Sequence, residues 1–196
     1  MNAQRDTSSQ PNWLVRLFGI DPRSLALFRI IFGLVLIYDL ATRAVDFRAM
    51  YTDQGVAPLA TVAESHRGSW HWSLYMLNES TAYQATLYGL SVILALTLLI
   101  GYRSRWSAFL LWVLLVSLHV RTPYLVTGGD VLLVVMLFWG MFLPLGKQWS
   151  IDSVLLKRRP TTLEPIVSMA SAAILLQIFF MYFFTVLMKL NDIWFS

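Results

Sequence analysis

The sequence predicts an all-α integral membrane protein with about five transmembrane helices and an interfacial helix near the N-terminus. Hydrophobic residues make up 57% of the 196-residue chain, charged residues only 13%, and the mean hydropathy is +0.61. In soluble proteins about a quarter of the residues are charged. Cysteine is absent, which excludes disulfides, thiolate metal sites and cysteine nucleophiles.

The chain is predicted to divide at about residue 23. Residues 1–23 are expected to form a polar tail and a short amphipathic helix, because Trp13 and Leu17 lie opposite Arg16 at helical spacing. The tail lacks the layout of a cleavable signal peptide, so we expect the first apolar run to be retained. Residues 24–196 are expected to form the membrane bundle.

Five apolar runs in the bundle are close to the length of about 20 residues that a helix needs to cross a bilayer. They cover residues 24–42, 81–102, 105–124, 129–145 and 164–189. A long polar segment, residues 43–80, separates the first two runs. Its Trp70, Trp72 and Tyr75 are expected to anchor it in the membrane interface.

The distribution of basic residues predicts the orientation of the bundle. Nine lie on the side of the N-terminus: Arg5, Arg16, Arg23, Arg103, Arg105, Lys147, Lys157, Arg158 and Arg159. Five lie on the opposite side: Arg43, Arg48, Arg67, Arg121 and Lys189. Because positive charge favours the cytoplasmic side, we expect a cytoplasmic N-terminus and an external C-terminus. The basic triplet at 157–159 fits contact with anionic lipid, and no nucleic-acid partner is predicted.

Charged residues gather at the outer end of the predicted bundle, where a polar pocket would tolerate them. We expect Asp39, Arg121 and Asp130 to line this pocket, with Arg121 or Lys189 as the cationic partner of Asp39. His119 ends the third run beside them. Structural roles remain open for each, and Asp130 after two glycines is also typical of a helix cap. Lys189 is either an end residue that reaches the headgroups or a partly buried, neutral amine able to act as a base.

Two further polar features are weaker. Arg29 lies about five residues inside the first run, so we expect it to extend to the inner headgroups. His66 and His71 are separated by five residues, a poor spacing for two ligands on one helical face, and no metal site is predicted.

Four segments in order resemble the HTTM family, the membrane domain shared by bacterial proteins and the vitamin K-dependent gamma-carboxylases. They are SLALFRIIFGLVLIYDL, MYTDQGVAP, GYRSRWSAFLLWVLLVSLHVRTPYLVTGGD and FLPLGKQWSIDS. The resemblance covers the chain from about residue 24 and is closest to the bacterial members. It implies a bacterial inner membrane location, with the C-terminus in the periplasm and with a bundle that is incomplete relative to the family.

The resemblance also suggests a candidate base. In the carboxylases a lysine in a Lys-Leu-x-x-x-Trp motif deprotonates reduced vitamin K, and Lys189, Leu190 and Trp194 match that motif here. Lys189 is therefore the candidate catalytic base, His119 a second candidate catalytic residue, and a quinone the possible cofactor. A histidine that the carboxylases use after the third span has no equivalent here, where Gly128, Gly129 and Asp130 stand, and the large outer peptide-binding domain is missing. A complete carboxylase is not expected.

Three functions remain open at this point. The chain could be a non-catalytic subunit of a larger membrane complex, a quinone-dependent oxygenase or carboxylase-like enzyme, or a lipid or small-molecule carrier. The enzyme requires Lys189 and His119 to line one cavity, and the subunit requires co-purification at fixed stoichiometry. The carrier requires a pocket open at both faces, for which Arg29 is the inner polar candidate.

The predicted orientation can be tested with topology reporters. A reporter fused after Lys157 should report a cytoplasmic location, and one placed near Gly68 an external location, because the nine basic residues are predicted to stay inside. The opposite pattern would contradict both the orientation and the outer polar pocket.

Overall fold

The computed structural model describes residues 12–56, 58–65, 67, 72–155 and 165–190, and their regular structure is helical. One isolated antiparallel bridge joins Ile20 to Ile166. The all-α prediction is therefore confirmed for the described residues. The helices are α1 (Asn12–Phe18), α2 (Pro22–Val45), α3 (Phe47–Tyr51), α4 (Leu59–Ser65), η1 (Leu74–Met76), α5 (Thr81–Ile100), α6 (Ser104–Arg121), η2 (Pro123–Leu125), α7 (Gly128–Gly140), α8 (Ile151–Leu155) and α9 (Met169–Lys189).

Three of these helices are long and apolar enough to cross a membrane, namely α2, α5 and α9 with 24, 20 and 21 residues. Helix α6 has 18 residues but carries Arg105, His119 and Arg121. Helix α7 has 13 residues and is about 20 Å long, short of a hydrocarbon layer of about 30 Å. All five predicted runs contain a helix, but five membrane spans are not confirmed.

Local sequence signals set the helix ends. Asp21 caps α2 by accepting a hydrogen bond from the amide of Arg23, and Pro22 occupies the first helical position, where no amide donor is needed. Ser80 caps α5 through the amide of Tyr83. Helix α5 ends at Gly101, whose φ of 76° is in the left-handed region.

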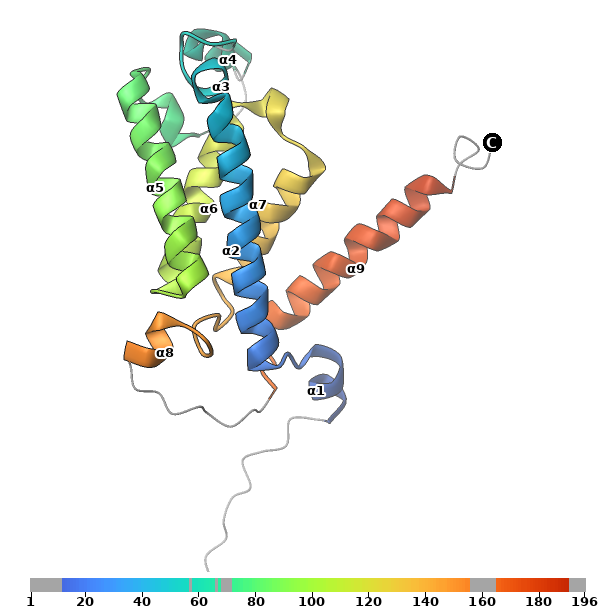
Figure 1. Ribbon diagram of the computed structural model, residues 1–196. Helices are drawn as coiled ribbons and strands as arrows, with labels where there is room; N and C mark the ends of the chain where they lie inside the picture. Colours follow the sequence, from blue (N-terminus) through green and yellow to red (C-terminus); the bar gives the residue numbers. More distant parts are fainter. Residues whose placement is uncertain (1–11, 57, 66, 68–71, 156–164, 191–196) are drawn as a thin grey trace, which may run out of the picture.

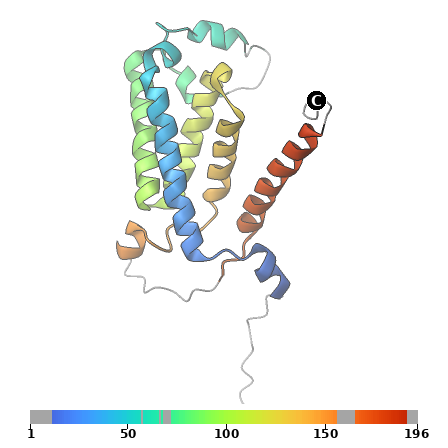
Figure 2. The same cartoon turned by 45° about the vertical axis from the view of Figure 1, so that its right-hand side comes forward.

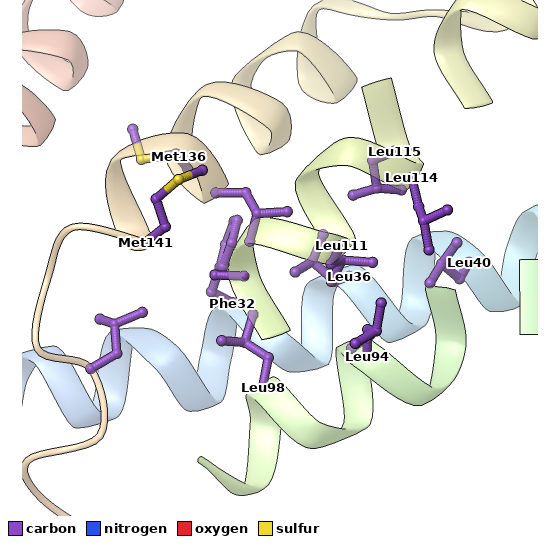
Figure 3. Close-up of a cluster of buried hydrophobic side chains, with 14 of the residues drawn as sticks. Phe32, Leu36, Leu40, Leu94, Leu98, Leu111, Leu114, Leu115, Met136 and Met141 are labelled. Atoms are coloured by element: carbon purple, nitrogen blue, oxygen red, sulfur yellow. The ribbon is translucent and has the colours of Figure 1, made fainter. Parts of the chain in front are cut away.

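Four helices form the body of the protein. Helix α2 packs against α5, α5 against α6, and α6 against α7 (Figure 1). Their contact surfaces are dominated by leucine, and Figure 3 shows Leu36 of α2 beside Leu111 of α6. Helix α9 contacts α7 and α1, and its C-terminal half stands away from the other helices in both views (Figures 1 and 2).

One of the three predicted interfacial residues lies elsewhere than expected. Tyr75 is 0% exposed and belongs to the core, so it is not a membrane-surface anchor. Burial raises the pKa of its hydroxyl, which therefore stays protonated at neutral pH. Trp72 is 62% exposed, as an interfacial residue would be, whereas Trp70 lies outside the described residues.

Arg29 does not reach towards headgroups as the sequence suggested, because it is 1% exposed. Its guanidinium donates hydrogen bonds to the carbonyls of Leu145 at 3.0 Å and Trp149 at 2.6 Å. The turn at Gly101 lies directly against this guanidinium, and a Cβ there would be 2.2 Å from Nη1 of Arg29. Arg29 therefore fastens α2 to the segment that follows α7, and the α5–α6 turn closes over it.

This arrangement makes Gly101 sensitive to a single added methyl group. Gly101→Ala should cost about 1–2 kcal/mol for the left-handed backbone alone, and more because Arg29 must move. Gly89→Ala is the matched control, since its Cβ would meet no atom within 4 Å and alanine favours a helix by about 1 kcal/mol. Thermal unfolding in detergent should show a lowered midpoint for Gly101→Ala only. Equal midpoints would contradict the close packing of the turn on Arg29.

Candidate functional site

A single guanidinium joins two helices at the end of α2. Arg43 Nε lies 3.0 Å from each carboxylate oxygen of Asp39, one turn earlier on the same helix. Its Nη2 donates to Oδ1 of Asp130 in the first turn of α7. Its Nη1 lies 3.4 Å from the hydroxyl of Tyr51, at the end of α3. The side chains of Arg43 and Asp130 are only 12% and 5% exposed.

Asp130 has two roles at the start of α7. Its Oδ2 accepts hydrogen bonds from the amide and hydroxyl of Thr127 at 2.6 and 3.0 Å, while Thr127 accepts one from the amide of Asp130. This reciprocal capping box confirms the helix-cap interpretation of Asp130. The other carboxylate oxygen remains available to Arg43, so the cap of α7 is tied to α2.

A cavity of about 280 Å³ lies beside this cluster. Its lining residues are Asp39, Thr42, Arg43, Asp46, Met50, Tyr51 and Leu125. Of the three residues predicted to line a polar pocket, Asp39 lines this cavity, whereas Asp130 and Arg121 do not, and the cation in the lining is Arg43. One guanidinium between Asp39 and Asp130 leaves a net charge of −1 on these three residues. The cavity can accept hydrogen-bond donors and is unfavourable for anions.

Arg121 lies in a separate ion pair. Its guanidinium approaches Asp53 at 3.4 Å, and its side chain is 1% exposed. Asp53 also accepts a hydrogen bond from the amide of Leu59. The predicted pairing of Asp39 with Arg121 or Lys189 is therefore wrong, because Arg43 lies four residues from Asp39 on one helical face. That spacing was the available signal in the sequence.

His119 faces an apolar cavity of about 410 Å³. Residues of α6, η2, the following loop and α7 line it: Val116, His119, Val120, Pro123, Val126, Val131, Val134 and Val135. The imidazole of His119 interacts electrostatically with Arg43, Asp130 and Asp39. His119 thus lies within electrostatic range of the charged cluster and borders an apolar space.

Lys189 lies apart from His119. It is the last residue of α9, its side chain is exposed, and that end of α9 stands away from the bundle (Figure 2). It is not among the residues that line the His119 cavity. Trp194 of its motif lies outside the described residues, as do His66 and His71. Among the described residues no group of three potential ligands could hold a metal ion.

Comparison with known protein families identifies the family of the chain. The family model of the HTTM domain matches residues 19–196, from the residue after α1 to the end of the chain. No curated protein and no solved structure matches the sequence.

Removal of the Arg43 side chain tests its role as a bridge. Arg43→Leu leaves Asp39 and Asp130 without their shared counter-charge, so the protein should be destabilised by about 3–5 kcal/mol. Arg48→Leu is the control, because Arg48 on α3 is exposed. Denaturant unfolding in mixed micelles measures both variants. Similar losses in the two would show that Arg43 contributes no more than a surface charge.

Proposed function

The chain belongs to the HTTM domain family and is a membrane protein, and from this premise we propose that it acts as a non-catalytic subunit of a larger membrane complex. The proposed partner is a protein whose transmembrane helices pack against α9. The exposure of α9 is the observation that carries the proposal.

We infer the membrane arrangement from the helices and the basic residues. Helices α6 and α7 complete five spans, with α7 crossing the bilayer partly through its flanking loops. The N-terminus is cytoplasmic and the C-terminus periplasmic in a bacterial inner membrane. Residues 1–23, with α1 lying in the interface, form a unit distinct from the membrane bundle at 24–196.

The buried charges support a structural role. Arg43 is paired with Asp39 and Asp130, Arg121 with Asp53, and Arg29 with two backbone carbonyls. Each of these arginines joins segments that are distant in the sequence or closes a helix end. Arginine does not release its proton at physiological pH, so none of them can act as a base. The candidate base Lys189 does not line the cavity that the second candidate, His119, borders.

Of the three long apolar helices in the described part of the chain, α9 is the least buried. Only 11% of its most apolar stretch of 18 residues is buried, compared with 39% for α2 and 33% for α5. Its N-terminal end is attached to the bundle, because Ile166 just before it bridges to Ile20 and the helix contacts α1 and α7. The tilt of a membrane helix is set by the helices packed against it. A partner's helices would pack against the exposed side chains of the C-terminal half of α9.

The exposed surface of α9 is suited to packing against other helices. Phe179 stacks on Phe183 with ring centroids 5.7 Å apart, and Phe180 lies beside Phe184 at 6.3 Å. These contacts hold the four rings as two pairs along α9 in the absence of a partner. Because apolar burial alone does not drive association in lipid, preformed and well-packed surfaces are what membrane helices use to recognise one another.

Co-purification tests this proposal. From membranes extracted in mild detergent, the tagged protein should carry one partner at fixed stoichiometry, and Phe179→Ala with Phe183→Ala should remove it. The control is Ile31→Ala with Leu34→Ala, two equally exposed positions on α2, which should keep the partner. A protein that purifies alone with lipid, or loses its partner equally in both variants, would contradict the proposal.

A substitution of Lys189 distinguishes a non-catalytic subunit from a quinone-dependent enzyme. Lys189→Arg keeps the charge but removes the ability to give up a proton, so a subunit should keep its stability and its partner. In an enzyme the same variant should fold and lose any quinone-dependent turnover. Turnover of a reduced quinone by the wild-type protein that Lys189→Arg abolishes would replace the subunit role with catalysis.

A further inference from the structure

A second polar cavity lies at the opposite end of the bundle from the Arg43 cluster. Its volume is about 450 Å³, and it lies between the α5–α6 turn and the segment that joins α7 to α8. The lining residues are Arg103, Ser104, Arg105, Trp106, Leu143, Pro144, Leu145, Gly146 and Asp152. Neither its residues nor its position overlaps the Arg43 cluster or the His119 cavity.

The backbone amides at the start of α6 already donate hydrogen bonds to the carboxylate of Asp152. Oδ1 of Asp152 accepts a hydrogen bond from the amide of Arg103 at 2.9 Å, and Oδ2 one from the amide of Ser104 at 3.4 Å. The N-terminus of α6 is therefore capped, and any ligand must be recognised by side chains. A carboxylate oxygen has two lone pairs, so Asp152 can accept further hydrogen bonds from a ligand.

Three side-chain groups in the cavity are available for a ligand. The hydroxyl of Ser104 is buried, at 4% exposure, and has no hydrogen-bond partner among the described residues. The guanidiniums of Arg103 and Arg105 are exposed, and neither forms an ion pair within the described part of the chain. Two guanidiniums and a hydroxyl donor are suited to the oxygens of a phosphate group.

An apolar groove continues from this polar cavity. It has a volume of about 320 Å³ and is lined by Arg105, Trp106, Phe109, Met141 and Phe142. Arg105 and Trp106 line both spaces, so the polar cavity and the groove are contiguous. Trp106 and Phe142 are 65% and 53% exposed, as residues that face lipid are. A polar cavity that opens into an apolar groove beside a tryptophan is typical of the membrane interface.

We propose that this composite site binds one phospholipid, with the phosphate held by Arg103, Arg105 and the Ser104 hydroxyl and an acyl chain in the groove. Asp152 lines the same cavity and gives it a carboxylate beside the two cations. That combination complements a zwitterionic headgroup. Because Asp152 can accept N–H hydrogen bonds, the site favours an ethanolamine headgroup over choline, which has no N–H, and over glycerol, which has no positive charge.

Native mass spectrometry of the delipidated full chain, titrated with lipids of matched acyl chains, tests the headgroup preference. Phosphatidylethanolamine should bind one molecule per chain, about tenfold more tightly than phosphatidylcholine or phosphatidylglycerol, because a charge-assisted hydrogen bond is worth this much. Equal affinity for the three lipids would overturn the ethanolamine assignment. Free phosphoethanolamine in excess should not displace the lipid, since it cannot fill the groove. Full displacement would identify a soluble phosphate ester as the ligand and overturn the lipid site.

Substitutions locate the bound lipid. Arg103→Gln with Arg105→Gln should weaken binding by about tenfold or more, and Ser104→Ala should weaken it without loss of a cap. Arg23→Gln is the matched control, an exposed arginine at the same end of the bundle that does not line the cavity. Loss of binding in the control, or unchanged binding in both site variants, would overturn the site. Circular dichroism confirms that each variant is folded before the titration is interpreted.

Discussion

A guanidinium among apolar helices must find its counter-charges within the protein, and Arg43 finds two, on its own helix and on α7. Helix α7 packs mainly on α6, and α2 mainly on α5, so this ion pair joins the two ends of the row of helices. It also holds the capping box of Asp130 in place, because the same carboxylate serves both. The position of α7 in turn sets the cavity that His119 faces.

The same constraint explains the two other buried arginines. Arg29 is satisfied by two carbonyls in the segment after α7, and Arg121 approaches Asp53 in the long connection between α2 and α5. In each case a charged side chain of a long helix holds an irregular segment against the bundle. Buried arginines therefore hold the connecting segments against the bundle, while leucine side chains pack the helices against one another. The proposed phospholipid site uses two arginines of a different kind. Arg103 and Arg105 form no ion pair within the described residues and can bind a lipid phosphate.

Periodicity and length predicted the helices well, because a bilayer demands about 20 apolar residues and their ends carry recognisable caps. The lengths of α6 and α7 were less predictable, since the apolar run of α7 continues past Gly140 into a non-helical segment that sequence hydropathy does not distinguish. Asp39 and Asp130 share the guanidinium of Arg43, but Asp130 does not line the cavity beside Asp39. Arg43 was overlooked because its charge was assigned only to orientation. The burial of Arg29 depends on carbonyls more than a hundred residues away, which no local pattern reveals.

Arg43 couples α2 to α7 through Asp130, and a double-mutant cycle measures the free energy of that coupling. Arg43→Gln, Asp130→Asn and the double variant are unfolded in mixed micelles and compared with the wild-type protein. Asparagine retains the cap of α7, so the cycle isolates the ion pair. We predict a coupling free energy of about 0.5–3 kcal/mol, the range for residues in one hydrogen-bond or ion-pair network. Effects that add to within about 0.5 kcal/mol would contradict the account, because the two helices would then be held independently of this pair.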